Sequence, residues 1–361
     1  MKVLLLKCNY RGAYDSFDEF YRNIERIFIQ ASIEVIYANN KEEAINILEL
    51  NKVDFSINVG QYSFYVDGKP LYEVFKTMNY QWIIDNPLRY KNCDFKSKYN
   101  RLIYIDGNFS LFPKCYRADY ISMSLPYPEY KINKTLKKKG KIILAPMKIK
   151  DILDFEGEIE KSEDKILLWD FLHNYDYDES FNRYIVQYIK EKDIKNMQKF
   201  FEIANGYIRV KKRVRILQSI NKHEVYVLSE RPDSISFNKN IHFLGKKSYS
   251  EYRSLQNEIE IVLNSNPNYD MCIHDRVSGG VMNGNIILSD RNDILDEINM
   301  PMCFTYSNLC YIDKYIDEIV KADMLVFAFP LYVDSIPSHI LYLMERISEN
   351  HRNNKLIIYV I

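Results

Sequence analysis

Residues 256–290, QNEIEIVLNSNPNYDMCIHDRVSGGVMNGNIILSD, contain the pattern that decides the fold of this chain. An apolar run at 259–263 stops at a polar turn, and a helix-compatible segment at 274–283 leads to a second apolar run at 286–288. Strand, loop, helix and strand in this order predict one unit of a parallel α/β sheet. Ligands of such sheets bind at the carboxyl ends of the strands and at the helix N-termini that face them. We therefore expect a ligand site between the first strand and the start of the helix.

The residue types at this expected site suit a ligand that carries phosphate. The expected site contains two amides, an imidazole, a guanidinium and a stretch of small residues that lets a ligand approach the backbone closely. These residues are Asn264, Asn266, His274, Arg276, Ser278, Gly279 and Gly280. Guanidinium groups and helix N-termini are common phosphate-binding groups. An ordinary βαβ unit with a polar loop shows the same spacing, so the pattern alone leaves both interpretations open.

The same stretch resembles the donor-binding end of the spore-maturation (CgeB-type) glycosyltransferases and their relatives of the GT-B fold. In that family a strand ending in an Asn/Pro turn leads to a His-x-Arg helix start, a small-residue turn and a strand ending in Asp. This chain has the matching residues in order: Asn264, Pro267, His274, Arg276, Asn283, Gly284, Ser289 and Asp290. The similarity extends more weakly over residues 1–310. This sequence departs from the family's pattern at Gly279, because related enzymes often place there a carboxylate that can hold the donor's ribose.

The resemblance implies transfer of a sugar from a nucleotide-sugar donor to a glycan or protein acceptor, without a cofactor. His274 and Arg276 would neutralise charge on the leaving phosphate, and the helix dipole would take the role of a metal. The implied donor-binding residues are Asn264, Asn266, Ser278, Gly279, Gly280, Asn283, Gly284 and Asp290. For Asp290, capping a turn is an equally good interpretation. An inactive transferase-like scaffold is the alternative function that Gly279 favours.

Length and composition exclude several classes of protein. The 361 residues suffice for two domains, and the 49 basic and 49 acidic side chains balance, so no global field recruits nucleic acid. No apolar stretch approaches the roughly 20 residues that span a bilayer. The cysteines form no C-x-x-C pair, which predicts reduced thiols in a cytoplasmic protein: Cys8, Cys93, Cys115, Cys272, Cys303 and Cys310.

The rest of the chain predicts two Rossmann-like domains of α/β class. Apolar runs alternate with amphipathic segments over residues 1–131, which we expect to form the acceptor-side domain. A basic linker at 132–141 would lead to a donor domain at 142–314. Two predicted strand ends in the first domain carry carboxylates, Asp85 and Asp106. Each is a candidate to contact an acceptor hydroxyl, and each could equally start a turn; the resemblance favours Asp85.

Two further segments of the second domain carry charged patterns. The basic helical segment 206–220 makes Arg209, Arg213 and Arg215 candidates to contact a diphosphate, and a solvated helix face is the alternative interpretation for most of them. The triplet at 176–178 imitates an Asp-x-Asp metal site but lacks the preceding apolar strand, so we expect no metal there.

The sequence changes character at about residue 315. Residues 315–361 resemble the middle of the NADPH-dependent FMN reductases of flavodoxin fold, where Ala-Asp precedes an apolar strand and a Pro-x-Tyr loop follows it. This resemblance implies flavin contacts at Pro330, Leu331, Tyr332 and Val333. No Gly/Ser-rich phosphate loop precedes the segment, so we expect an incomplete flavodoxin-like βαβ tail. FMN would be a cofactor only if this tail functions, and an FMN reductase fragment is a second alternative.

Overall fold

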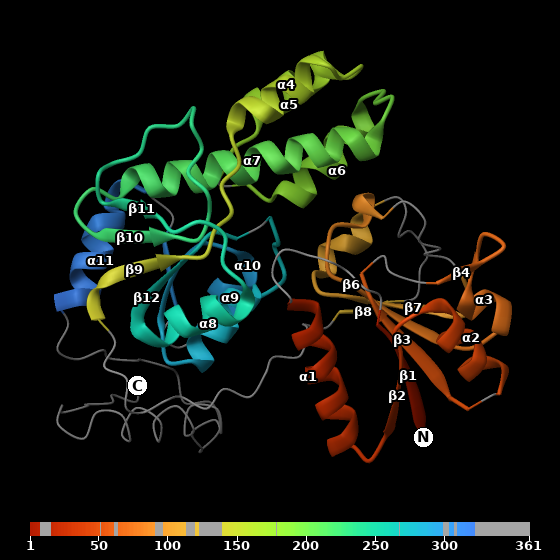
Figure 1. Ribbon diagram of the computed structural model, residues 1–361. Coiled ribbons are helices and arrows are strands. Elements are labelled where there is room, and N and C mark those ends of the chain that lie inside the picture. Colours follow the sequence, from red (N-terminus) through yellow and green to blue (C-terminus); the bar gives the residue numbers. More distant parts are fainter. Residues whose placement is uncertain are drawn as a thin grey trace, which may run out of the picture.

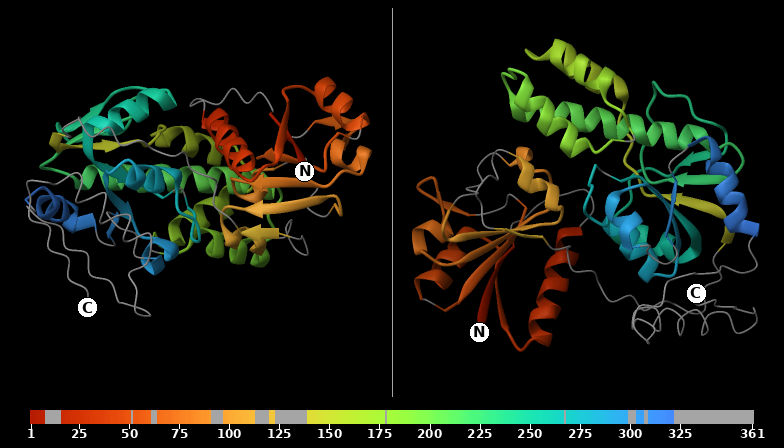
Figure 2. Two further views of the ribbon diagram at one scale, coloured as in Figure 1. Left: turned by 90° about the horizontal axis from the view of Figure 1, so that it is seen from below. Right: turned by 180° about the vertical axis from the view of Figure 1, so that it is seen from behind.

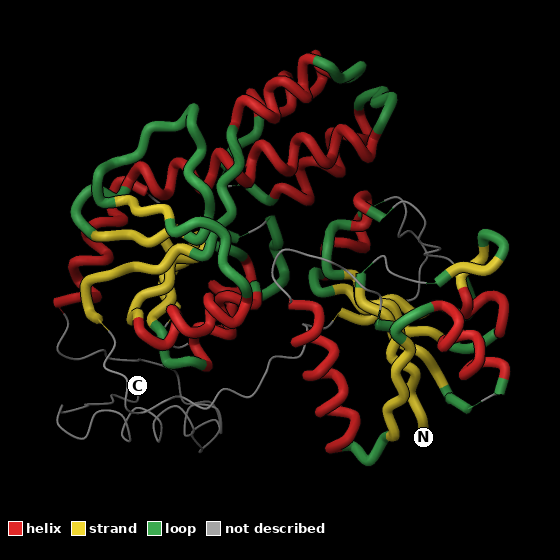
Figure 3. Tube along the Cα trace, viewed as in Figure 1, coloured by secondary structure: helices red, strands yellow, loops and turns green. Residues whose placement is uncertain are grey.

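The structure is a computed structural model that describes residues 1–7, 16–50, 52–60, 64–90, 97–112, 120–122, 139–177, 179–266, 268–298, 303–306 and 309–321. Its strands form two six-stranded sheets in separate α/β halves of the chain (Figure 1). Helices flank each sheet on both faces (Figure 3). The expected α/β class with two Rossmann-like domains is confirmed. No helix of the described part is long and apolar enough to cross a membrane.

The first sheet has the order β2-β1-β3-β6-β7-β8, and all its neighbouring strands are parallel. The strands are β1 (Lys2–Leu6), β2 (Glu34–Ala38), β3 (Phe55–Val59), β6 (Asn79–Ile83), β7 (Asn100–Tyr104) and β8 (Tyr120–Ser122). Side chains of a strand alternate between its two faces, so Leu5 joins the core beneath α1 (Ser16–Gln30). Leu4 and Leu6 pack on the other face with α2 (Lys41–Glu49) and α3 (Leu71–Phe75). A small hairpin, β4 (Tyr65–Val66) and β5 (Lys69–Pro70), precedes α3.

The second sheet has the order β11-β10-β9-β12-β13-β14, again with parallel neighbours throughout. Its strands are β9 (Lys139–Ala145), β10 (Glu224–Val227), β11 (Ile241–Phe243), β12 (Ile259–Asn264), β13 (Ile286–Asp290) and β14 (Cys303–Tyr306). The chain starts in the middle, moves to one edge and returns beside its first strand, so the direction of winding switches between β9 and β12. Ligands of doubly wound sheets bind at such a switch point.

The helices of the second domain cover both faces of this sheet. One face packs against α8 (Tyr249–Glu258), α9 (Asp275–Met282) and α10 (Asp293–Ile298), through a core that includes Val262 and Ile287. The other packs against α7 (Met197–Ser219) and α11 (Ile312–Lys321). Strand β9 begins inside the predicted linker 132–141, and residues 132–138 lie outside the described part.

The connection from β9 to β10 is a layer of four helices, α4 (Ile152–Glu160), α5 (Lys165–Asn174), α6 (Phe181–Glu191) and α7. The views from below and behind show α7 as the longest of these, running across the sheet (Figure 2). The predicted helical segment 206–220 forms the C-terminal part of α7, which begins at Met197. Gly206 lies inside the helix, where a Cβ would collide with the Phe155 ring of α4. The missing side chain therefore lets the two helices approach closely, which outweighs the poor helix propensity of glycine.

The two domains meet through the segments that follow strands β6, β7 and β12. The 3₁₀ helices η1 (Pro87–Arg89) and η2 (Gly107–Leu111) contact α7 and α6. The Tyr269 hydroxyl donates to the Ile84 carbonyl at 2.8 Å, and Asn86 donates to Asn182 at 3.1 Å. The carboxyl end of the first sheet therefore lies against the loop after β12, which joins the switch point of the second sheet.

Candidate functional site

A cavity of about 810 Å³ lies at the carboxyl ends of β9, β10 and β12; we call it the first cavity. Residues from both domains line it: Asp85, Arg89, Pro146, Lys148, Lys150, Phe155, Glu158, Glu202, Asn205, Gly206, Arg209, Val210, Arg213, Leu228, Lys247, Tyr249, Tyr252, His274, Asp275 and Arg276. The three residues predicted to be catalytic, Asp85, His274 and Arg276, are among them. The structure therefore brings together, in one concave site, side chains that lie far apart in the sequence.

Positive charge dominates the lining of the first cavity. Lysine and arginine outnumber aspartate and glutamate by seven to four. The pKa of Lys148 is lowered, first by partial burial and then by the neighbouring charges of Lys150, Lys246 and Arg213. A lysine whose pKa falls beside other cations lies in a positive potential that bound anions would relieve. The site therefore suits a polyanion such as a diphosphate.

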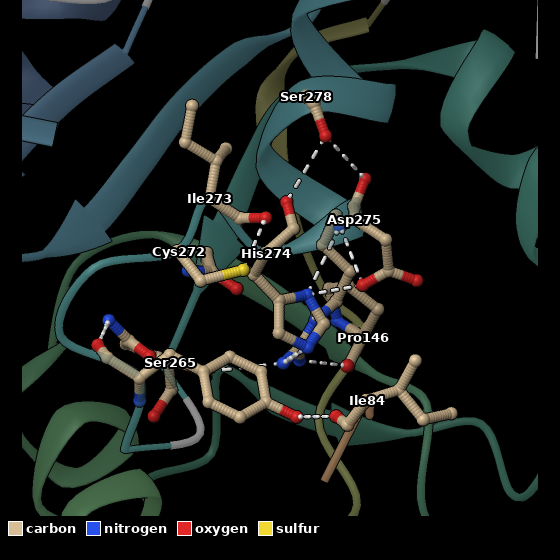
Figure 4. A network of polar contacts seen from close by, with 12 residues as sticks. Ile84, Pro146, Ser265, Cys272, Ile273, His274, Asp275 and Ser278 are labelled. Carbon is tan, nitrogen blue, oxygen red and sulfur yellow. Dashed lines mark hydrogen bonds and ion pairs between the residues drawn. The ribbon is translucent and has the colours of Figure 1, made fainter. Parts of the chain in front are cut away.

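Arg276 connects the segments that follow the two strands at the switch point; Figure 4 shows its partners Pro146, Ser265 and His274. Arg276 is 8% exposed, and its guanidinium donates to the Pro146 carbonyl beyond β9 at 2.6 Å and to the Ser265 carbonyl beyond β12 at 3.2 Å. It also contacts the His274 ring at 3.1 Å. Most of its donors are thus engaged within the protein. Arg276 acts as a clamp that shapes the wall of the cavity.

His274 and Asp275 form the N-terminal end of α9. The His274 ring caps the helix by accepting from the Arg276 N–H at 3.2 Å, and it also contacts the Asp275 carboxylate. Burial, and then the charge of Arg276, lower the pKa of His274 to about 4. Burial would raise the pKa of Asp275, but the contact with His274 and the charge of Arg276 outweigh it and hold that pKa at about 2. At neutral pH the pair is a neutral imidazole beside an ionised carboxylate.

We expect His274 to make stability depend on pH. Its folded pKa of about 4 lies below the ordinary 6.5, so between these values the unfolded chain binds a proton that the folded protein excludes. Folding stability from this group is complete above pH 6.5 and falls by roughly 3 kcal/mol at pH 4. Urea unfolding of the native protein and of His274→Asn, which keeps a capping acceptor, should show this difference in slope.

Two buried carboxyls oppose this trend but cancel in the comparison. Burial, and then Asp270, raise the pKa of Asp106 to about 6, and burial also raises the pKa of Asp270, so both groups favour the folded state as the pH falls. Both are present in both proteins, so the difference between the proteins reports His274 together with its effect on the pKa of Asp275. Parallel stability curves for the two proteins between pH 7 and pH 4 would contradict the prediction.

Two arginines of α7 reach the first cavity, and the third candidate does not. The Arg213 guanidinium donates to the Lys148 carbonyl at 2.6 Å. Arg209 lies between the domains, near Asp85 and Tyr269, and burial is the first cause that lowers its pKa. Within the described part of the chain its guanidinium makes no hydrogen bond and no ion pair. Arg215 lines a different cavity, because its position on the helix turns it away from Arg209.

The two carboxylates predicted at strand ends of the first domain have different environments. Asp85 lines the first cavity and pairs with Arg89 at 2.6 Å. Asp106 is fully buried, caps η2 through the Asn108 N–H at 2.8 Å, and accepts the Asp270 N–H of the other domain at 2.7 Å. The structure thus gives Asp106 the turn-forming role and a bond between domains. Asp85 keeps an open position beside the cavity.

Three residues predicted to bind the donor lie beside the first cavity without lining it. Asn264 is buried and donates to the Ser289 hydroxyl at 2.9 Å. Asn266 exchanges side-chain bonds with the Tyr269 backbone, at 2.7 and 3.0 Å. The Asp290 carboxylate accepts the Asn266 N–H at 2.6 Å and pairs with Lys212 at 2.7 Å. Asp290 therefore fixes the loop after β12, in agreement with the turn-capping interpretation.

The remaining donor-binding predictions fall within or behind α9. Ser278 donates to the His274 carbonyl at 3.3 Å, and a Cβ on Gly280 would collide with Ile287 of β13. These contacts and the burial of Gly279 result from the packing of the helix on the sheet.

Asn283 and Gly284 require a correction. A helix that follows a parallel strand runs back toward the amino edge of the sheet, so its C-terminal end lies opposite the ligand site. There Gly284 ends the helix with φ +72°, and Asn283 donates to the Gln256 carbonyl at 3.1 Å. The predicted donor contacts of these two residues do not fit this placement.

Sequence reasoning missed several residues of the first cavity. Lys148 and Lys150 follow β9, and Tyr249 and Tyr252 come from the first turn of α8. The same strand-end rule that selected residues 264–276 would have found the lysines if applied to the first strand of the domain. The tyrosines carry no local signal, because only the winding of the sheet brings α8 beside β9.

Some predictions lie outside the described residues. These are Pro267 and the flavin contacts Pro330, Leu331, Tyr332 and Val333, with the rest of the tail from residue 322. Across the part of the chain that is described, no group of three or more His, Cys, Asp or Glu side chains could hold a metal ion.

Comparisons with known proteins extend the description of the fold. No protein-family model and no curated protein matches the sequence. Among solved structures, AviGT4, a glycosyltransferase involved in avilamycin A biosynthesis, aligns with 89% of this chain and 88% of its own, with a TM-score of 0.51 and 12% identity. A glycosyltransferase from Rickettsia africae ESF-5 aligns with 88% of this chain and 87% of its own, with a TM-score of 0.40 and 9% identity, too low a score to carry an argument. The likeness to AviGT4 agrees with a GT-B arrangement of the two domains. The CgeB-type resemblance stays a prediction.

Proposed function

We propose that this protein is a glycosyltransferase that takes its sugar from a nucleoside-diphosphate donor bound in the first cavity. The observation that carries the proposal is the surplus of cations in this cavity, at the switch point of a sheet whose fold a known glycosyltransferase shares. In the reaction the bond between the sugar C1 and the diphosphate oxygen breaks. A bond from C1 to an acceptor oxygen forms, and the acceptor hydroxyl loses its proton.

The lining divides into regions that match the parts of such a donor. Lys148, Arg213 and Arg209 would face the diphosphate, whose charge they would neutralise as it develops on the leaving group. The Tyr249 and Tyr252 rings form an aromatic wall that suits a nucleobase. Asp85, on the first domain, would lie on the acceptor side.

A thermal unfolding series tests the proposal directly. The protein is melted with UDP, GDP, CMP, dTDP and their sugars, and with FMN as a separate ligand. A nucleotide at about 100 times its Kd should stabilise the protein by roughly 2.7 kcal/mol. Lys148→Ala, an exposed change at the cavity, should remove most of this shift and leave the melting temperature of the free protein unchanged. A shift with FMN alone, or no shift with any nucleotide, would contradict the proposal; the second result would favour a non-catalytic scaffold.

A further inference from the structure

A second cavity, of about 770 Å³, lies on another side of α7 and has no part in the proposed donor site. It is formed by the connection between α5 and α6, by the loop after β12 and by the segments that follow β13 and β14. Tyr175, Tyr177, Lys212, Asp290 and Tyr306 are among its lining residues. It is nearly as large as the first cavity, so it could hold a ligand of comparable size.

Positive and negative side chains are nearly balanced in the second cavity. Lys212 pairs with Asp290 at 2.7 Å, and the Arg215 guanidinium lies over the Tyr177 ring at 4.7 Å. Carboxylates slightly outnumber lysines and arginines in the lining, in contrast to the first cavity. A phosphate group would therefore meet carboxylates here without a surplus of cations. The second cavity does not suit a nucleotide.

The second cavity instead combines aromatic surface with many hydrogen-bonding groups. The half-buried Tyr177 ring packs edge-on against Tyr175, with ring centres 5.5 Å apart, and contributes to the wall. Carboxylate, amide and hydroxyl groups surround these rings, at Glu179, Asn292 and Asp293 among others. A pyranose ring has an apolar C–H face that packs on an aromatic ring and a rim of hydroxyls that such groups bind. We propose that the second cavity binds an uncharged saccharide.

The second cavity is separated from the first cavity by a wall of side chains. Asn268 and Tyr269 line it and also line a narrow space of about 10 Å³ that reaches Asp85 and Arg209 of the first cavity. Such a space holds about one water molecule. The Asn268 amide closes it further by donating to Asn205 at 2.8 Å. If the proposed transferase function holds, a saccharide in the second cavity lies apart from the donor, so it occupies a second sugar site and not the position of the attacking hydroxyl.

Saturation-transfer NMR with a panel of neutral di- to tetrasaccharides tests this inference on the full chain. We expect at least one of them to bind with millimolar affinity or better, both with and without a nucleoside diphosphate. Tyr177→Ala should weaken that binding by about tenfold or more, and Tyr177→Phe, which keeps the ring, should preserve it. Asp293→Ala, an exposed change on the rim, should weaken it by about three- to tenfold without altering the melting temperature.

The controls separate this inference from the proposed function. Lys148→Ala, in the first cavity, should leave saccharide binding unchanged while it impairs nucleotide binding. Nucleotide binding without any saccharide binding would overturn the inference and leave the donor site intact. Saccharide binding that is indifferent to both Tyr177→Ala and Asp293→Ala, or preferential binding of a peptide or a sugar phosphate at this cavity, would also overturn it.

Discussion

Replacement of Arg276 by alanine should lower the free energy of unfolding by roughly 3–5 kcal/mol, as expected when one partner of a buried, hydrogen-bonded charge is removed. The guanidinium is the shared donor for the Pro146 and Ser265 carbonyls, at 2.6 and 3.2 Å. Without it, both carbonyls lose this donor, and the loss costs most at Ser265, which is buried. The Asp275 carboxylate also loses the cation that helps to hold its pKa at about 2. Urea unfolding at pH 7 measures the change.

Arg183→Ala is the matched control for this experiment. Arg183 also makes a contact across the fold, to Asp293 at 3.3 Å, but its side chain is 58% exposed. Exposed ion pairs contribute little, so this variant should stay within about 1 kcal/mol of the native protein. If the Arg276→Ala protein keeps native stability but no longer binds any nucleotide, the structural role assigned to Arg276 is wrong. Arg276 would then be a direct ligand of the donor phosphate.

The architecture of this chain was predictable because its strands are short apolar runs between clear helix signals. The apolar runs predicted at 259–263 and 286–288 lie within β12 and β13. The basic segment 206–220 was predicted to be helical, and it forms the C-terminal part of α7. The role of Gly206 in close helix packing was not predictable, because its contact with Phe155 is a long-range one that the local sequence does not show.

The candidate site was predictable only in part, for a geometric reason. Asp85, which follows a strand, and His274, which caps the helix facing the strand ends, follow from the rule that ligands bind at that edge of a parallel sheet. Whether a polar side chain there faces ligand or protein depends on its neighbours. Asn264, Asn266 and Asp290 have the expected residue types, but they bond Ser289, Tyr269 and Lys212. Sequence alone does not show that these partners exist.

Arg276 and Arg209 show two different uses of a partly buried guanidinium. Arg276 has backbone acceptors in the protein, so its burial is compensated and it contributes to stability. Arg209 is half-buried, and burial, with the charges of Arg89 and Arg276, lowers its pKa more than the nearby Tyr269 and Asp85 raise it. Its guanidinium makes no hydrogen bond and no ion pair within the described residues. We propose that a bound anion compensates this charge.

Arg209→Met should therefore change stability and ligand affinity in opposite directions. Methionine keeps the apolar part of the side chain, and loss of an uncompensated charge should leave the free energy of unfolding equal or higher by up to about 1 kcal/mol. A charge-assisted bond to a diphosphate contributes about 1.5–3 kcal/mol, so the Kd for the nucleoside diphosphate should rise roughly 10- to 100-fold. Calorimetric titration and urea unfolding measure the two quantities on the same preparation.

Two arginines on the same helix serve as controls for this prediction. Arg215→Met changes a guanidinium that lies over Tyr177 in the second cavity, so nucleotide affinity should stay as it is. Arg213→Met removes the bond to the Lys148 carbonyl at 2.6 Å, so it should lower both affinity and stability. If Arg209→Met destabilises the protein as Arg213→Met does, Arg209 has a structural acceptor and its charge is not held for a ligand. Gain of stability together with loss of affinity at Arg209 alone would identify it as the anion-binding residue between the two domains.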